Sequence, residues 1–423
     1  MSKQSVRNLL EVGQGNEIAI TAPNRKPLNY NGLRIHVDLI GEQLASIGLK
    51  NSDRVAIVLP NGPEMATAFL AVASYMSAAP LNPSYKEAEY EFYLEDLKPK
   101  LVIVEENTSN PVVKAAKKLS IPIAEISVDK DNAAGEFSLF ETRKSINIPG
   151  IEMEALVLHT SGTTSRPKVV PLTQSNLVAS AGNISDTLKL KETDHSLNIM
   201  PLFHIHGLIA VLCASISAGS SVCCTPGFNA LKFFELANSQ KITWYSGVPT
   251  MHQAILLRGQ RQADVAKALN LRFIRSSSAS LPPAVFDELI ALFNCPVIEA
   301  YGMTEATHQM TSNPLPPQKQ KAGFVGLPAG PEVCIMDAAG NKLAEGEEGE
   351  VCIKGDNVTP GYDKNPEANS QSFTDGWFRT GDQGKFDEDG YAIIDLELKD
   401  SFKVEIVNDL QKILAGQNLK KNP

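Results

Sequence analysis

The amino-acid sequence predicts an α/β protein whose parallel sheets are followed by a small antiparallel barrel or sheet. Over roughly the first 300 residues, apolar strand-like runs alternate with helix-like runs. This pattern is typical of parallel sheets covered by helices on both faces. After about Gly323 the segments shorten and a glycine recurs every few residues, which is typical of short strands joined by turns.

The strand-like runs of the first region are short and apolar, and helical spacing appears between them. We expect strands over residues 55–59, 101–104, 155–159, 242–245, 271–276 and 297–300. Apolar residues at helical spacing predict helices over residues 64–76, 111–119 and 175–188. The longest uncharged apolar stretch, residues 207–224, contains two glycines and four serines. We therefore expect a buried helix followed by a strand there, and not a membrane span.

Composition places the chain among globular proteins with a large core. The 423 residues are 43% apolar, and 39 basic against 48 acidic residues give a net charge of −9. Such an acidic balance opposes bulk binding to nucleic acid or to an anionic membrane surface, but it leaves room for one local positive site. The six cysteines form no C-x-x-C pair, and no secretory signal opens the chain. We therefore expect reduced thiols and a cytoplasmic protein without membrane insertion.

The segment at residues 158–168, LHTSGTTSRPK, follows an expected strand and combines several hydroxyls, a glycine and two cations. Backbone N–H groups and hydroxyls in such a loop can hold phosphate oxygens, and the ammonium of Lys168 adds a point charge. The loop is not of the Walker A type, because no glycine precedes the lysine and no serine or threonine follows it. Its composition alone leaves both a phosphate site and an ordinary polar turn open.

Five further motifs follow in order: PLFHIHG at residues 201–207, SASLP at 278–282, YGMTE at 301–305, GEV to GY from 349 to 362, and WFRTGD at 377–382. Together with the loop, they resemble the adenylate-forming enzymes, a family of AMP-binding acyl- and aryl-CoA synthetases. The resemblance covers roughly residues 10–394. It implies two parallel-rich sheets in an αβαβα layering plus a small β-barrel subdomain, with residues 1–394 as the AMP-binding domain.

The resemblance also implies where ATP and Mg²⁺ would bind. The phosphates would lie against Thr160, Ser161, Gly162, Thr163, Thr164 and Lys168. The adenosine would contact Ser278, Ala279, Ser280, Glu299, Ala300, Tyr301, Gly302 and Asp382. Among these, the Tyr301 ring would stack on the base and the Asp382 carboxylate would bond the ribose hydroxyls. Thr304 would bond a phosphate, and Glu305 with Thr164 would hold Mg²⁺, which prefers oxygen ligands.

The reaction that the resemblance implies has two steps. A substrate carboxylate attacks the α-phosphorus of MgATP to give an acyl-adenylate and pyrophosphate, and the thiol of coenzyme A then displaces AMP to give a thioester. The catalytic residues would be Lys168, His204, Thr304 and Glu305. They would act by positioning and charge neutralisation, without a protein nucleophile.

The residues expected around the acid are polar, which disfavours a long-chain fatty acid. Residues 305–316 and the TSGTTSRPK loop resemble the oxalate–CoA ligase branch of the family. His206, Ser276 and His308 would then contact a small polar acid such as oxalate, with the two histidines on its distal carboxylate. Packing or helix-capping roles for these histidines remain an alternative.

Three departures from the family pattern favour a second interpretation. Val169 stands where the family has a glycine after Pro-Lys, and Glu397 stands where it has an arginine that contacts the ribose. We expect residues 395–423 to be an eroded hinge or remnant of the family's C-terminal domain, whose catalytic lysine cannot be assigned. The alternative function is therefore a nucleotide- or acyl-adenylate-binding pseudoenzyme that forms no thioester.

Overall fold

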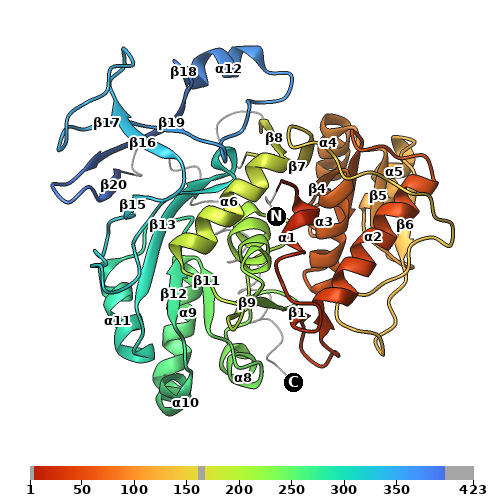
Figure 1. Cartoon of the computed structure of the whole chain (residues 1–423), viewed down its shortest axis with the longest axis horizontal. Coiled ribbons are helices and arrows are strands. Elements are labelled where there is room, and N and C mark those ends of the chain that lie inside the picture. Colours follow the sequence, from red (N-terminus) through yellow and green to blue (C-terminus); the bar gives the residue numbers. More distant parts are fainter. Residues whose placement is uncertain (1–3, 161–166, 396–423) are drawn as a thin grey trace.

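The computed structural model describes residues 4–160 and 167–395, which form two mainly parallel sheets and one smaller antiparallel sheet. In Figure 1 the first sheet (orange) lies beside the second (green), and the third (blue) lies at one end of the molecule. The predicted order of an α/β region followed by an antiparallel region is confirmed. The expected phosphate contacts at residues 161–164 and the departure at Glu397 lie outside the described ranges.

The first sheet has the strand order β6-β5-β3-β4-β7-β8. Its strands are β3 (Arg54–Val58), β4 (Ser77–Pro80), β5 (Leu101–Glu105), β6 (Ile123–Ile126), β7 (Glu154–His159) and β8 (Val169–Thr173). Neighbours run parallel except β7 and β8, which pair antiparallel. The helices of this unit are α2 (Tyr30–Ser46), α3 (Pro63–Tyr75), α4 (Glu87–Leu97) and α5 (Val112–Lys118). The strands expected in this sheet and the helices expected beside it occur at their predicted places.

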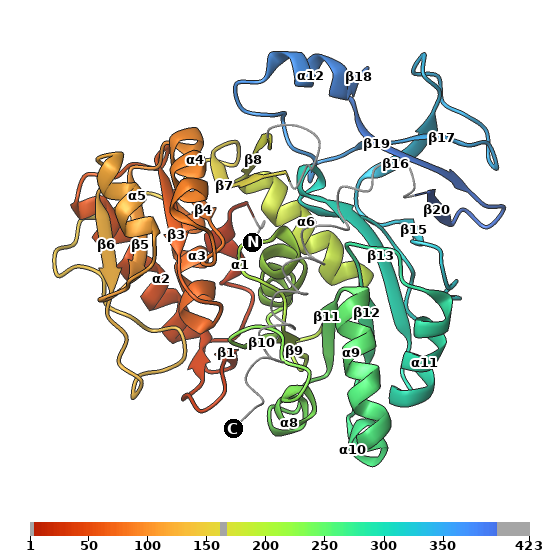
Figure 2. The ribbon, with the colours of Figure 1, turned by 180° about the vertical axis from the view of Figure 1, so that it is seen from behind.

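The second sheet has the strand order β15-β14-β13-β12-β11-β9-β10-β1-β2. Its strands are β1 (Ile18–Thr21), β2 (Leu28–Asn29), β9 (His195–Asn198), β10 (Ser221–Cys224), β11 (Trp244–Gly247), β12 (Phe273–Ser276), β13 (Val297–Met303), β14 (His308–Ser312) and β15 (Leu327–Pro328). The strands from β13 to β1 run parallel, and those at the two edges pair antiparallel. Its helices include α6 (Gln174–Thr187), α8 (Phe233–Ser239), α9 (Pro249–Gly259), α10 (Ala263–Ala268) and α11 (Pro283–Phe293). Figure 2 shows the same arrangement from behind, with α3 and α6 between the two sheets.

The third sheet is antiparallel and carries the last motif. It consists of β16 (Glu332–Met336), β17 (Gly349–Lys354), β18 (Phe373–Thr374), β19 (Trp377–Phe386) and β20 (Ala392–Asp395), with α12 (Pro366–Ser372) beside it. Within it, β19 pairs with β17, β18 and β20. The WFRTGD motif lies on β19, so its aspartate is held on the longest strand of this sheet.

The apolar stretch at residues 207–224 forms the expected buried helix and strand. A π-helix (His206–Cys213) continues as α7 (Ala214–Ser217), and β10 follows. Among the described residues, no helix is both long and apolar enough to cross a membrane. The six cysteines are free thiols, as expected, and all but Cys334 are buried.

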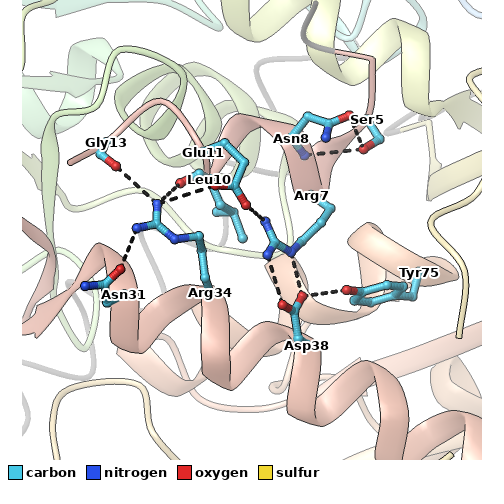
Figure 3. Close-up of polar contacts among 10 residues, drawn as sticks. All are labelled: Ser5, Arg7, Asn8, Leu10, Glu11, Gly13, Asn31, Arg34, Asp38 and Tyr75. Carbon is cyan, nitrogen blue, oxygen red and sulfur yellow. Dashed lines mark hydrogen bonds and ion pairs between the residues drawn. The ribbon is translucent and has the colours of Figure 1, made fainter. Parts of the chain in front are cut away.

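A short N-terminal helix, α1 (Val6–Leu9), is held by a polar cluster shown in Figure 3. The Arg7 guanidinium makes two hydrogen bonds to the Asp38 carboxylate on α2, at 2.5 and 2.9 Å. The Tyr75 hydroxyl on α3 donates to the same carboxylate at 2.5 Å, and Arg34 donates to the carbonyl oxygen of Leu10 after the helix. One carboxylate thus ties α1 to two helices of the first unit.

Candidate active site

The predicted site residues meet where parallel strands of the two sheets end. β7 ends just before the phosphate loop, β9 before the PLFH segment and β12 before the turn at residues 278–280. A cavity of about 80 Å³ lies between them, and its wall includes Thr160, His204, His206, Ser278 and Thr304. Carboxyl ends of parallel strands are the usual ligand position in open α/β sheets. The fold therefore joins motifs that are far apart in the sequence.

The described ends of the phosphate loop are joined by two hydrogen bonds. The backbone N–H of Thr160 donates to the carbonyl oxygen of Lys168 at 2.9 Å, and the backbone N–H of Lys168 donates to Oγ1 of Thr160 at 3.0 Å. Val169 follows as the first residue of β8 and is buried in the sheet core. Its extended backbone needs no glycine, so this departure from the family pattern is accommodated by the sheet.

Lys168, Tyr362 and Glu305 form a chain of contacts beside the loop. The ammonium of Lys168 lies 4.5 Å from the centre of the Tyr362 ring, and the Tyr362 hydroxyl donates to Oε1 of Glu305 at 2.7 Å. Burial raises the pKa of the Glu305 carboxyl, while this hydrogen bond and the positive charge of Lys168 act in the opposite direction. The carboxylate is thus fixed in position beside a cation.

The oxygen atoms of Thr304 and Glu305 are of the kind that Mg²⁺ prefers. Within residues 4–160 and 167–395, no group of three or more His, Cys, Asp or Glu side chains could hold a metal ion. Mg²⁺ in nucleotide enzymes is commonly held by one or two carboxylates together with substrate phosphates and water. The residues present therefore fit a magnesium ion that binds together with the nucleotide. The other expected ligand, Thr164, lies outside the described residues.

On the nucleotide side, the hydroxyl of Tyr301 donates to the carboxylate of Asp382. Tyr301 lies on β13 of the second sheet and Asp382 on β19 of the third. Burial, with the nearby Asp382 charge, raises the pKa of Tyr301 well above its ordinary value, so the phenol remains a proton donor. A ribose that bonds Asp382 has to share or replace this contact.

Other expected nucleotide contacts lie beside Tyr301 in tightly fixed backbone. The buried Glu299 carboxylate accepts the backbone N–H of Gly323 at 2.8 Å, and burial raises its pKa to about 7. A Cβ atom on Gly302 would lie 1.7 Å from the carbonyl oxygen of His308, so only glycine fits there. Ser278 has a φ of 70°, which marks the turn that Ala279 and Ser280 continue. Glu299 therefore fixes the backbone at Gly323, in addition to the adenosine contact that was predicted for it.

On the acid side, His206 and His308 lie together. Their ring centres are 4.9 Å apart at an interplanar angle of 61°. Nδ1 of His206 lies 3.0 Å from Oγ of Ser278, and its Nε2 lies 2.7 Å from Oγ of Ser246. Ser276, at the end of β12, is buried, and its hydroxyl has no hydrogen-bond partner among the described residues. The three predicted acid-binding residues are thus brought to one region of the molecule.

Arg275 on β12 lies behind this wall and is completely buried. Its Nη2 donates to Oε1 of Gln309 at 3.2 Å, and longer contacts of 3.4 and 3.5 Å reach Ser246 Oγ and His308 Nδ1. Its Nε has no hydrogen-bond partner among the described residues. Arg275 also takes no part in the ion pairs formed within the described residues. The guanidinium is therefore surrounded by neutral polar groups.

The electrostatics of this side follow from burial. Burial lowers the pKa of Arg275 to about 9, which leaves the guanidinium charged at neutral pH. Burial, with the positive charge of Arg275, drives the pKa values of His206 and His308 well below 6.5. Both imidazoles are therefore neutral at pH 7. The acid side holds one buried positive charge without an internal counter-ion.

Asn61 does not line this cavity but holds one of the segments that do, and the motifs do not identify it. Its Oδ1 accepts the backbone N–H of Leu202 at 2.7 Å, and its Nδ2 donates to the carbonyl oxygen of Thr225 at 3.0 Å. Leu202 belongs to the segment that carries His204 and His206, so Asn61 ties this segment to the end of β3. The available signal was a polar residue directly after an expected strand, where α/β proteins place ligand-site residues.

His159 also lines the cavity without a role assigned by the motifs. Its Nε2 lies 2.9 Å from Oδ2 of Asp96 on α4, and its ring packs against Tyr93 with centres 4.6 Å apart. Its position directly before the phosphate loop was visible in the sequence. The aspartate partner was not, because it lies 63 residues away along the chain.

The comparisons with known proteins agree with this geometry. A family model described as AMP-binding enzyme matches residues 11–363. The oxalate–CoA ligase of Arabidopsis thaliana is 42% identical over an alignment that covers 92% of this chain and 78% of the relative. The oxalate–CoA ligase of Saccharomyces cerevisiae is also 42% identical, with coverages of 82% and 69%.

Solved structures with similar folds include ATP-bound MatB from Rhodopseudomonas palustris, with a TM-score of 0.83 and 27% identity over 93% of this chain and 78% of that chain. Another is the o-succinylbenzoate CoA synthetase MenE from Bacillus subtilis in complex with its acyl-adenylate intermediate, with a TM-score of 0.79, the same identity and the same coverages. The extent of the family match and the identity to the two ligases decide the assignment. The chain belongs to the family of AMP-binding enzymes.

Proposed function

We propose that this chain is an ATP-dependent acid–CoA ligase whose acid is small and carries a second acidic group, as oxalate does. The observation that carries the proposal is the completely buried Arg275, which forms no ion pair within residues 4–160 and 167–395 and whose Nε has no hydrogen-bond partner there. An unpaired buried charge is costly, so the acid side is electrostatically incomplete until an anion binds. The similarity to two oxalate–CoA ligases supports the same class of acid.

The size of the cavity supports a short acid. Its volume of about 80 Å³ lies well below the roughly 300–1,000 Å³ of sites for drug-sized ligands. An acid of a few heavy atoms suits this space, whereas a long acyl chain does not. The distal carboxylate would face Arg275 through the wall of His206 and His308, which leaves the proximal carboxylate toward the phosphate loop.

In the first step of the proposed reaction, an oxygen of the proximal carboxylate attacks the α-phosphorus of ATP. The bond to the bridging oxygen breaks, and pyrophosphate leaves with the electron pair. Lys168 neutralises phosphate charge, and the hydroxyl of Thr304 orients a phosphate oxygen. Glu305 would hold Mg²⁺, which neutralises further phosphate charge when bound.

In the second step, the sulfur of coenzyme A bonds to the carbonyl carbon of the adenylate. The bond from this carbon to the phosphate oxygen breaks, AMP leaves with the electron pair, and the thiol proton passes to solvent. The chain itself forms no covalent bond to the acid. Its contribution is the fixed geometry of the acid, with the distal carboxylate held against the wall of His206 and His308 that covers Arg275.

A nucleotide- or adenylate-binding protein that forms no thioester is the second candidate. The observation that favours it is Glu397, an acidic residue where the family has a ribose-contacting arginine. A carboxylate there would repel the phosphates of the nucleotide. The two candidates share the nucleotide site and differ in the thioester step.

Two assays on the purified chain test both candidates. Oxalate-dependent exchange of labelled pyrophosphate into ATP reports the first step, and chromatography of oxalyl-CoA reports the second. We expect both activities, with acetate, which lacks the second carboxylate, at least roughly a hundredfold poorer in kcat/KM. Exchange without thioester supports the second candidate. Absence of oxalate-dependent exchange contradicts the ligase proposal, and equal rates with acetate contradict the role of Arg275.

A further inference from the structure

A second cavity of about 400 Å³ lies between the two parallel sheets, apart from the active cavity. It is placed where β1 and β10 of the second sheet and β3, β5 and β6 of the first sheet end. No residue lines both cavities. Its volume lies within the range of small-molecule sites, and its position at carboxyl ends of parallel strands is typical of ligand sites. The proposed ligase reaction does not use it.

Much of the wall of this second cavity is apolar. Four proline rings contribute, from the segments that follow β1, β3 and β10: Pro23, Pro60, Pro63 and Pro226. Leu59 and Ile126 add aliphatic surface. Such a wall favours a ligand with an apolar body, because burial of apolar surface supplies most of the binding free energy of small molecules.

The charged residues of the wall are two cations and two anions. Nη1 of Arg25 lies 2.7 Å from Oε1 of Glu64, and Nη2 donates to a backbone carbonyl. Nε of Arg25 is buried and has no hydrogen-bond partner among the described residues. This nitrogen has almost no accessible surface, so a ligand in the cavity does not reach it, and the charge of Arg25 is already paired with Glu64.

Glu105 and Lys130 complete the charged part of the wall. Neither takes part in the ion pairs formed within the described residues. Burial raises the pKa of Glu105, and the negative charge of Glu64 adds to this effect. A cation beside Glu105 would relieve both contributions. Within the described residues, the wall thus carries one anion, Glu105, and one cation, Lys130, that form no ion pair, and both are exposed.

We propose that this cavity binds a zwitterionic small molecule with an apolar body, of which an apolar α-amino acid is the simplest example. Its carboxylate faces the ammonium of Lys130, its ammonium faces Glu105, and its side chain packs on the prolines. A simple anion would leave Glu105 without a partner. A simple cation would leave Lys130 without one. Only a ligand with both charges matches the wall.

The test is binding to the purified chain, measured by calorimetry and by thermal shift with L-leucine and L-phenylalanine. We expect saturable binding that raises Tm as ligand concentration rises. Leucinamide lacks the carboxylate, N-acetyl-leucine lacks the ammonium and glycine lacks the apolar body. Each should bind at least roughly tenfold more weakly. No binding of either amino acid, or equal binding of these analogues, overturns the proposal.

Two variants locate the ligand. Glu105→Gln removes the acid expected to face the ammonium, and Val128→Trp fills the cavity from its rim, where Val128 is 36% exposed. Both should raise the Kd for leucine at least roughly tenfold. Ile148→Trp, at a residue that is 47% exposed and outside the cavity wall, is the matched control and should leave Kd unchanged. Binding that survives Val128→Trp but is lost in Arg275→Lys would place the ligand in the active cavity and overturn the proposal.

Discussion

The two sides of the candidate site differ in how their charges are balanced before any substrate binds. On the nucleotide side, Asp382 accepts a hydrogen bond from Tyr301, and Glu305 accepts one from Tyr362. On the acid side, Arg275 is completely buried with neutral partners and an unpartnered Nε. The nucleotide side thus has internal partners that a ligand can exchange, whereas on the acid side the described part of the chain gives Arg275 no counter-ion, which a ligand can supply.

This difference predicts different consequences of substitution. A group that already has a partner contributes to stability and to binding, so its removal affects both by modest amounts. An unpaired buried charge lowers stability and is retained for what it binds. Substitutions on the acid side should therefore separate binding from stability, whereas those that remove a hydrogen bond on the nucleotide side should not.

The largest expected effect is that of Arg275→Met. Loss of the buried cation should raise the Kd for oxalate by at least roughly a hundredfold, because an anion would then be buried without its partner. The free energy of unfolding should stay unchanged or rise by about 1–3 kcal/mol, because an apolar residue of similar length replaces an unpaired charge. Calorimetric titration with oxalate and urea unfolding measure the two quantities.

The matched control is Arg272→Met, at the residue that directly precedes β12. Arg272 forms an ion pair with Asp194, whose side chain is 1% exposed. Its removal should lower the free energy of unfolding by about 3 kcal/mol, because a buried carboxylate loses its partner. Oxalate affinity should be unchanged. If Arg275→Met destabilises as much as Arg272→Met, Arg275 has a structural role and the proposed difference between the two sides is wrong.

The motifs predicted the nucleotide side from the sequence better than the acid side. The family motifs assigned Tyr301, Glu305 and Asp382 to one nucleotide site, and the structure brings Tyr301 and Asp382 into contact, while the roles of these residues stay predictions. The isolation of Arg275 could not be predicted, because it depends on which side chains β11 and β14 bring beside β12. Asn61 was missed for the same reason: its partners Leu202 and Thr225 are more than a hundred residues away.

The strands show the same difference: some can be predicted from their own residues, and others depend on pairing with distant segments. Strands with strong apolar runs were predicted close to their observed ends, because burial on both faces leaves a clear pattern. Strands such as β1 and β9 were not, although they are as long as the predicted β11 and β12. Their places in the second sheet depend on pairing with β10, which lies far along the chain from β1.

The second largest effect is expected from Glu305→Gln on the nucleotide side. The amide oxygen can still accept the Tyr362 hydrogen bond, but the charge that would hold Mg²⁺ is lost. The rate of oxalate-dependent pyrophosphate exchange should fall by roughly a hundredfold, with the free energy of unfolding within about 1 kcal/mol of the wild type. Tyr362→Phe, which leaves the carboxylate in place, should reduce the rate less. A larger loss in Tyr362→Phe than in Glu305→Gln would contradict this assignment.

A smaller effect is expected from Tyr301→Phe. The ring remains for the adenine, and Asp382 loses only its internal hydrogen-bond donor. ATP affinity should therefore stay within about threefold of the wild type, whereas Asp382→Ala should weaken it by roughly tenfold. Isothermal titration with ATP compares the two variants directly. Equal losses would mean that the Tyr301–Asp382 bond, and not the free carboxylate, is what the nucleotide needs.

The smallest expected effect is the pH dependence of oxalate binding. Because the pKa values of His206 and His308 lie well below 6.5 and that of Arg275 is about 9, the charge of the acid side does not change between pH 6 and pH 8. The Kd for oxalate should therefore vary by less than about twofold over this range, and binding should weaken only as Arg275 loses its proton above it. A histidine with an ordinary pKa of about 6.5 would instead gain a proton as pH falls and tighten anion binding severalfold. Calorimetric titration at pH 6, 7 and 8 distinguishes neutral histidines from a histidine that titrates. Tighter binding at pH 6 would show that a histidine becomes charged in the complex. The positive charge that faces the acid would then be shared with Arg275 and not carried by Arg275 alone.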